Sequence, residues 1–143
     1  MRTDDIQICR EVQRNAEMAI KAMDTIADKV HDKELSRDIS KQVIKYSEIK
    51  NKALDKLYEA KAEPHHTNRL EDIMLAGGIH SKTLLNTSTG HIAGLMIQGN
   101  TRGITEMQKA LNHYTNAGDK SLELAKELMD FEEDTIKRLK QYL

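Results

Sequence analysis

The sequence predicts an all-α protein in which four long helices form one bundle, as two antiparallel hairpins joined by a long, partly helical crossover. Aromatic residues make up only 3% of the 143 positions, whereas β-strands are enriched in aromatic and β-branched side chains. Apolar residues recur at alternating spacings of three and four along four stretches, which places them on one side of a helix. The only proline lies between the second and third stretches, and the length is typical of one domain.

The first two stretches form the first predicted hairpin. Its helices cover about residues 4–30 and 34–62, and the linker between them is so short that they must lie antiparallel. Pro64 ends the second helix, because proline has no N–H to donate and disfavours a helical residue before it. The inward-facing side chains are Cys9, Val12, Ala16, Ala19, Met23, Ile26 and Val30 in the first helix, and Leu35, Ile39, Val43, Tyr46, Ile49, Ala53 and Leu57 in the second.

The second predicted hairpin has helices at about residues 88–114 and 120–143. Ser88 or Thr89 can cap the first of them, since a side-chain oxygen at this position accepts a hydrogen bond from a free backbone N–H. The turn-forming residues 115–118 separate the two helices. The inward-facing residues are Ile92, Met96, Gly99, Gly103, Met107, Ala110 and Tyr114, followed by Leu124, Leu128, Phe131, Thr135, Leu139 and Tyr142.

Residues 63–87 connect the two hairpins. A helical path of about 25 residues rises about 37 Å, which is roughly the length of one bundle helix. This crossover can therefore return the chain to the end at which the second helix began, so that the second and third helices run parallel. We expect a short helix within the crossover, ending near Gly77.

Charge and composition exclude several functions. With 22 basic and 23 acidic residues the net charge is −1, so we expect neither nucleic acid nor a membrane as a partner. Cys9 is the only cysteine, which excludes an internal disulfide and a cysteine-based metal cage. No stretch has the apolar length of a membrane span, and the first residues lack the apolar core of a signal peptide. We therefore expect a cytoplasmic protein.

Two stretches of the second hairpin resemble known proteins. The closing stretch AKELMDFEEDTIKRLKQYL is similar to the last helix of the ferritin-like superfamily, in which an acidic pair precedes a basic, leucine-rich end. The stretch STGHIAGLMIQGNTRGITEMQKAL resembles small, uncharacterised bacterial members of that superfamily. The resemblance implies a ferritin-like four-helix bundle, whose connectivity agrees with the hairpins and crossover inferred above.

Di-iron members of that superfamily place one Glu on each of two helices and Glu-x-x-His on each of the other two. None of the four helices predicted here contains Glu-x-x-His. The nearest spacings are Glu48 with Asn51 and Glu132 with Thr135, and of these two glutamates only Glu132 falls on an inward-facing stripe. Because one inward carboxylate cannot hold two irons, we expect no di-iron site, no cofactor and no enzymatic activity.

Glu132 requires a partner, because an unpaired buried carboxylate is costly. We expect it to form a buried pair with Arg102, which lies about one turn from its level on the third helix. An alternative is a metal-binding or redox protein whose atypical site uses Glu132 or the histidines of the middle third, His80 and His91.

Gly99 and Gly103 lie four residues apart in the third helix, after Gly90 and Gly94. Glycine costs about 1 kcal/mol relative to alanine inside a helix, so this spacing indicates a packing requirement. Glycines on one ridge allow another helix to approach closely, or make room for a bulky side chain. A weaker alternative is a small-ligand site in this glycine-lined part of the bundle, beside Gly99.

The third helix has a second apolar edge. Residues 64–116, which contain it, have only seven charged side chains in 53 positions. A helix that is apolar on two sides must be covered on two sides, here by the crossover and by a second copy or another protein. We therefore predict a homodimer or a protein partner, and a function in association rather than catalysis. The interface residues are Ala93, Ile97, Ile104 and Leu111, with Asn100 among them.

Overall fold

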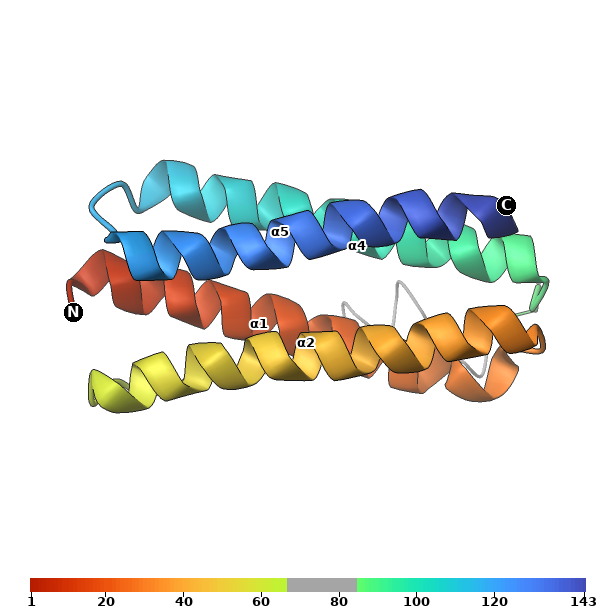
Figure 1. Ribbon diagram of the computed structural model, residues 1–143, viewed down its shortest axis with the longest axis horizontal. Helices are drawn as coiled ribbons and strands as arrows, with labels where there is room; N and C mark the ends of the chain where they lie inside the picture. Colours follow the sequence, from red (N-terminus) through yellow and green to blue (C-terminus); the bar gives the residue numbers. More distant parts are fainter. Residues whose placement is uncertain (67–84) are drawn as a thin grey trace.

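The computed structural model describes residues 1–66 and 85–143, which form an all-α bundle (Figure 1). Short 3₁₀ helices, η1 (Ala27–Lys29) and η2 (Lys140–Tyr142), extend the first and last α-helices. The predicted fold class is confirmed, and each helix begins and ends close to its predicted limits. The four helices are α1 (Thr3–Ile26), α2 (Lys33–Glu59), α4 (Thr89–His113) and α5 (Asp119–Leu139).

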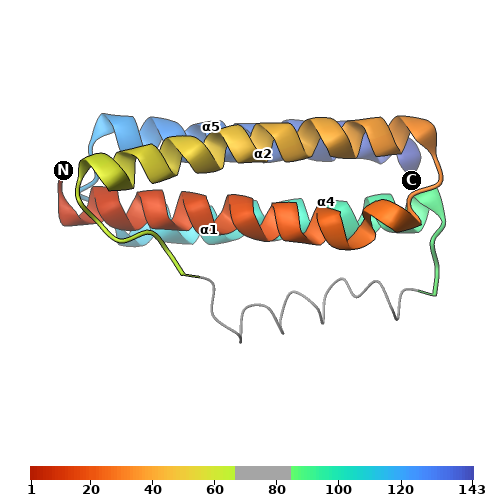
Figure 2. The same ribbon diagram turned by 90° about the horizontal axis from the view of Figure 1, so that it is seen from below.

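The helices are arranged as two antiparallel hairpins. α1 packs along α2, and α4 packs along α5 (Figure 1). Figure 2 shows that α2 ends beside the N-terminus, whereas α4 begins at the opposite end of the bundle, beside the C-terminus. α2 and α4 therefore run parallel, as the length of the connection predicts. The short helix expected near Gly77 lies outside the described residues.

The predicted inward stripes meet in one core. Tyr46, Ile92 and Leu128 are among its fully buried side chains, and they come from three different helices. Cys9 is also fully buried, and burial raises the pKa of its thiol to about 11. It packs as a small apolar side chain rather than as a nucleophile.

None of the described helices combines the length and the apolar composition that crossing a bilayer requires.

Asp5 joins the start of α1 to the turn between α4 and α5. Its carboxylate accepts hydrogen bonds from the Gly118 N–H at 2.7 Å, from the Arg2 N–H at 2.9 Å and from the Ser121 hydroxyl. The hydrogen bond from Ser121 and the two backbone N–H groups hold the pKa of Asp5 below its usual value, against the opposing effect of burial. Together with the hydrogen bonds of Asp4 and Arg2 with Asn116, this carboxylate ties one end of the bundle together.

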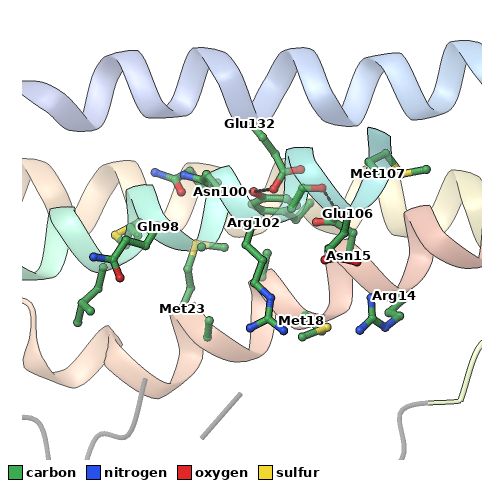
Figure 3. Close-up of a pocket in the computed structure, with 18 of the residues that line it drawn as sticks. Arg14, Asn15, Met18, Met23, Gln98, Asn100, Arg102, Glu106, Met107 and Glu132 are labelled. Carbon is green, nitrogen blue, oxygen red and sulfur yellow. Dashed lines mark hydrogen bonds between the residues drawn. The ribbon is translucent and has the colours of Figure 1, made fainter. Parts of the chain in front are cut away.

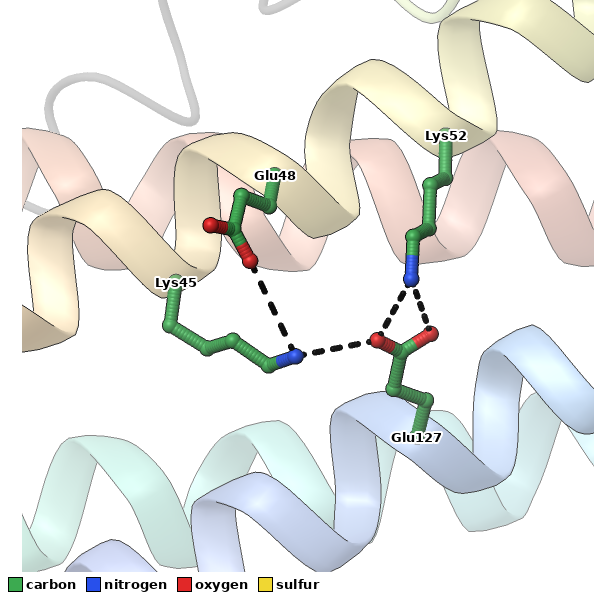
Figure 4. Close-up of polar contacts among 4 residues, drawn as sticks. All are labelled: Lys45, Glu48, Lys52 and Glu127. Carbon is green, nitrogen blue, oxygen red and sulfur yellow. Dashed lines mark hydrogen bonds and ion pairs between the residues drawn. The ribbon is translucent and has the colours of Figure 1, made fainter.

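A surface ion cluster joins α2 to α5 (Figure 4). The Glu127 carboxylate lies 3.1 Å from the Lys45 Nζ and 2.8 Å from the Lys52 Nζ. Lys45 also lies 3.9 Å from Glu48, which faces solvent as its position in the helix predicts. Because such exposed pairs contribute about 0–1 kcal/mol each, this cluster adds little to stability.

We expect the substitution Asp5→Ala to lower the free energy of unfolding by about 1–3 kcal/mol, because it leaves the Gly118 N–H without its acceptor and removes the hydrogen bond from the buried Ser121 hydroxyl to the carboxylate. Urea denaturation at pH 7 measures the difference. Asp24→Ala, at an exposed position of the same helix, is the matched control and should cost less than about 0.5 kcal/mol. Equal losses in the two variants would contradict the role of Asp5.

The contribution of Asp5 should also depend on pH. Its pKa is lowered in the folded protein, so the stabilisation is complete above the unfolded value of about 3.9 and is lost as the pH falls through the folded value. The difference between the wild type and Asp5→Ala should therefore shrink in acid. Urea titrations at pH 7, 4 and 2.5 measure it, and a difference that grows on acidification would contradict the assignment.

Candidate functional site

A cavity of about 260 Å³ lies in the middle of the bundle (Figure 3). Most of its lining comes from α1 and α4, and α2 and α5 supply the remaining residues. Four methionines form much of the apolar wall, and methionine adapts its shape to irregular spaces. The apolar lining residues are Met18, Ala19, Ala22, Met23 and Ile26 from α1, and Leu95, Met96 and Met107 from α4.

Polar side chains from all four helices meet at one side of this cavity. Glu132 of α5 is 1% exposed. The Tyr46 hydroxyl of α2 lies 3.0 Å from the Glu132 Oε2 and 2.8 Å from the Asn100 Oδ1 of α4. Asn15 of α1 donates a hydrogen bond from its Nδ2 to the Gly103 carbonyl at 2.9 Å. These residues form the polar cluster of the cavity: Asn15, Tyr46, Asn100 and Glu132.

With the Asn100 amide oriented as in this structure, the geometry of the polar cluster favours a protonated Glu132. The Tyr46 hydroxyl has one hydrogen, yet its oxygen lies within hydrogen-bond distance of two oxygens that accept. The second of these contacts therefore needs a hydrogen from the Glu132 carboxyl. Burial raises the pKa of Glu132 to about 8. Both arguments make the carboxyl neutral at pH 7.

Two polar atoms of the cluster have no partner within the described part of the chain. They are the Asn100 Nδ2, which donates, and the Glu132 Oε1, which accepts. Both are buried, and both residues line the cavity. Leaving a buried polar group unsatisfied costs about 1–3 kcal/mol, and such groups are rare in folded proteins. They therefore mark a place where a bound molecule can form hydrogen bonds.

Gly103 makes room for Glu132. A Cβ atom at Gly103 would overlap the Glu132 Oε2 and would lie 2.8 Å from its Oε1 and 2.9 Å from the Asn15 Oδ1, which is closer than a carbon atom can approach these oxygens. Of the two reasons considered for this glycine, room for a bulky side chain is the correct one. Gly99 is different, because it is exposed and, apart from its own helix, no atom of residues 1–66 and 85–143 lies within 4 Å of its Cβ position. The prediction that Gly99 packs against a helix is wrong for the four described helices.

Arg102 is not the partner of Glu132. It is exposed at the edge of the cavity, and its side chain points away from Glu132 (Figure 3). The predicted buried pair is therefore wrong, and Tyr46 is the partner instead. The prediction of a buried Glu132 is confirmed. A cation was expected because the carboxyl was taken as charged, whereas a neutral carboxyl needs only a hydrogen-bond partner.

The residues considered for a metal site are not brought together. Glu132 lies in the core, whereas His91 is exposed in the first turn of α4. The backbone N–H of His91 donates a hydrogen bond to the hydroxyl of the N-cap residue Ser88. His80 lies outside the described residues. The spacing Glu-x-x-His does occur once, from Glu63 to His66, but both side chains are exposed beyond the end of α2. In residues 1–66 and 85–143, no three His, Cys, Asp or Glu side chains could hold a metal ion together.

The second apolar edge of α4 is largely covered by the bundle itself. Ala93 is fully buried and Asn100 is 7% exposed, while Ile97 and Leu111 pack against the core and Ile104 is half-buried. The prediction that these residues form an intermolecular interface is wrong for Ala93 and Asn100. α4 contacts both α5 and α1, so two neighbours in the same chain cover the two apolar edges.

Comparison with known proteins supports the fold. Protein-family models and curated proteins gave no match to the sequence. The structure is similar to the crystal structure of a DUF305 fragment from Deinococcus radiodurans, with a TM-score of 0.75 and 13% sequence identity. The similarity covers 98% of this chain and 95% of that one. The two proteins share an all-α bundle fold over nearly their whole lengths.

Substitution of the two glycines by alanine should have opposite effects. Gly103→Ala should lower the free energy of unfolding by about 1–3 kcal/mol, because its Cβ collides with the Glu132 carboxyl. Gly99→Ala should raise it by up to about 1 kcal/mol, because the position is open and alanine favours the helix. Thermal and urea denaturation measure both, and a stabilised Gly103→Ala variant would contradict the tight fit at Glu132.

Proposed function

We propose that this protein binds a small, mainly apolar molecule in the cavity between α1 and α4, as a binding module rather than an enzyme. The observation that carries the proposal is the cavity with two buried, unpartnered polar atoms, the Asn100 Nδ2 and the Glu132 Oε1. An apolar cavity of about 150 Å³ accepts benzene. The space of about 260 Å³ here therefore admits a larger molecule.

The chemistry of the lining favours binding over catalysis. The methionine and alanine walls have no reactive group, and the polar cluster is fixed by its own hydrogen bonds. Within the described ranges, Cys9 is buried in the core as a thiol and belongs to no catalytic pair. Convergence of a few polar groups in an otherwise apolar pocket is typical of ligand sites.

We also retain three broader proposals. Two antiparallel hairpins joined by a crossover support membership of the ferritin-like superfamily. The sequence pattern supports a cytoplasmic location. Self-association would have to use a surface other than the buried residues Ala93 and Asn100. Sedimentation velocity tests it, and a single species at the chain mass of 16.3 kDa would exclude a stable dimer.

The cavity can be tested by NMR with methyl-labelled methionine and hexan-1-ol as the probe. The signals of the four cavity methionines should shift on titration, and those of Met1 and Met129, which do not line the cavity, should not. Ala22→Phe fills the cavity from α1 and should reduce the affinity at least tenfold. The shifting signals should come from Met18, Met23, Met96 and Met107.

Ala27→Phe is the matched control, because it adds the same ring at an exposed position just beyond α1. It should bind hexan-1-ol as the wild type does. Circular dichroism must show that both variants keep their helices. Uniform shifts across all methionines, or equal binding by Ala22→Phe and the wild type, would exclude the cavity as the binding site.

A further inference from the structure

The hydrogens of the polar cluster form a chain with a fixed direction. With the Asn100 amide oriented so that its Oδ1 accepts from the Tyr46 hydroxyl at 2.8 Å, that single hydrogen is used, and the contact with the Glu132 Oε2 at 3.0 Å takes its hydrogen from a neutral Glu132 carboxyl. This leaves the Glu132 Oε1 as a carbonyl-type oxygen that accepts. At the other end of the chain, the Asn100 Nδ2 still has hydrogens to donate.

A molecule that completes this chain must offer one donor and one acceptor. Its donor would bind the Glu132 Oε1, and its acceptor would bind the Asn100 Nδ2. A carboxamide or a hydroxyl group provides both in one small unit. An ordered water can do the same in the free protein, and a polar end group of a ligand can replace such a water without losing hydrogen bonds.

A charged end group fits this site poorly. A cation would require Glu132 to lose its proton, and then one of the two short oxygen contacts of Tyr46 would have no hydrogen. A carboxylate would bring its lone pairs against the Glu132 Oε1. In a largely apolar cavity, either charge would also lose its hydration without a matching partner.

The charged groups around the cavity do not change this preference. α1 contributes Glu11 and Arg14, which lie 3.7 Å apart, and α4 contributes Arg102 and Glu106. Two carboxylates and two guanidinium groups leave no net charge at the cavity edge. Within the described residues, α2 and α5 each add one titratable group to the lining, Tyr46 and Glu132 respectively.

We infer that the molecule bound in the cavity is uncharged and carries at its polar end both a hydrogen-bond donor and an acceptor, as a carboxamide or hydroxyl does, with an apolar body along the methionine wall. This inference rests on the proposed function and specifies the chemistry of its ligand. The neutral end group meets the Asn100 Nδ2 and the Glu132 Oε1, and the apolar part fills the space between α1 and α4.

Probes with the same six-carbon chain test the inference: hexanamide and hexan-1-ol, which are uncharged, and hexylammonium and hexanoate, which are charged. Calorimetric titration at pH 6.5 compares their affinities. The NMR signals of the cavity methionines show whether each probe binds in the cavity. The uncharged probes should bind at least tenfold more tightly than either charged probe. A charged probe that binds most tightly at the cavity methionines would overturn the inference and leave the proposed function intact.

The pH dependence provides a second, independent readout. Because the ligand binds the protonated form of Glu132, the affinity for hexanamide should fall as the pH rises through about 8. Glu132→Gln keeps a neutral group that both donates and accepts, so it should bind hexanamide within about threefold of the wild type and lose this pH dependence. Loss of hexanamide binding in a folded Glu132→Gln variant would overturn the inference.

Failure of the proposed function would give a different experimental result from failure of this inference alone. If none of the four probes shifts the signals of Met18, Met23, Met96 and Met107, the cavity binds no such molecule, and the inference falls with it. If Glu132→Gln does not fold, the pH profile of the wild type alone decides. A hexanamide affinity that rises above pH 8 would then contradict a neutral Glu132 as the binding partner.

Discussion

The burial of the Glu132 carboxyl is the constraint on which the centre of this bundle depends. A carboxyl group in an apolar core must lose its charge or find hydrogen bonds, and here it does both. Each of the other helices provides one part of the arrangement. α2 provides Tyr46, α1 provides Asn15, and α4 provides the space at Gly103 in which the carboxyl lies.

This arrangement also explains why the cavity lies where it does. Tyr46 is held in place by the edge of the Phe131 ring, with ring centroids 5.0 Å apart, and by its two short oxygen contacts. The cluster is thus fixed from the side of α2 and α5. On the side of α1 and α4 the lining includes several small residues, among them Ala19, Ala22 and Gly99, and four methionines, so these two helices leave space between them.

The neutral state of Glu132 separates this bundle from a di-iron protein. Two metal ions require several carboxylates that stay ionised, together with imidazole ligands. In the described part of the chain, the buried polar groups of the cavity are instead a phenol, the carboxamides of Gln42 and Asn100, and the neutral Glu132 carboxyl, next to the half-buried carboxamide of Asn15. Such groups exchange hydrogen bonds with a neutral molecule more readily than they balance the charge of metal ions.

The sequence alone determined the helices, their order and their inward faces, because helix periodicity and short linkers act locally along the chain. It also placed Glu132 in the core. Tertiary structure decided what that residue does, since a partner 86 positions away, Tyr46, could not be found from spacing along one helix. The same limit explains why Arg102 was assigned as the partner of Glu132, and why the buried edge of α4 was taken for an interface. Whether a polar or apolar side chain faces a neighbour, solvent or a cavity depends on how the helices pack, and only the assembled bundle specifies that.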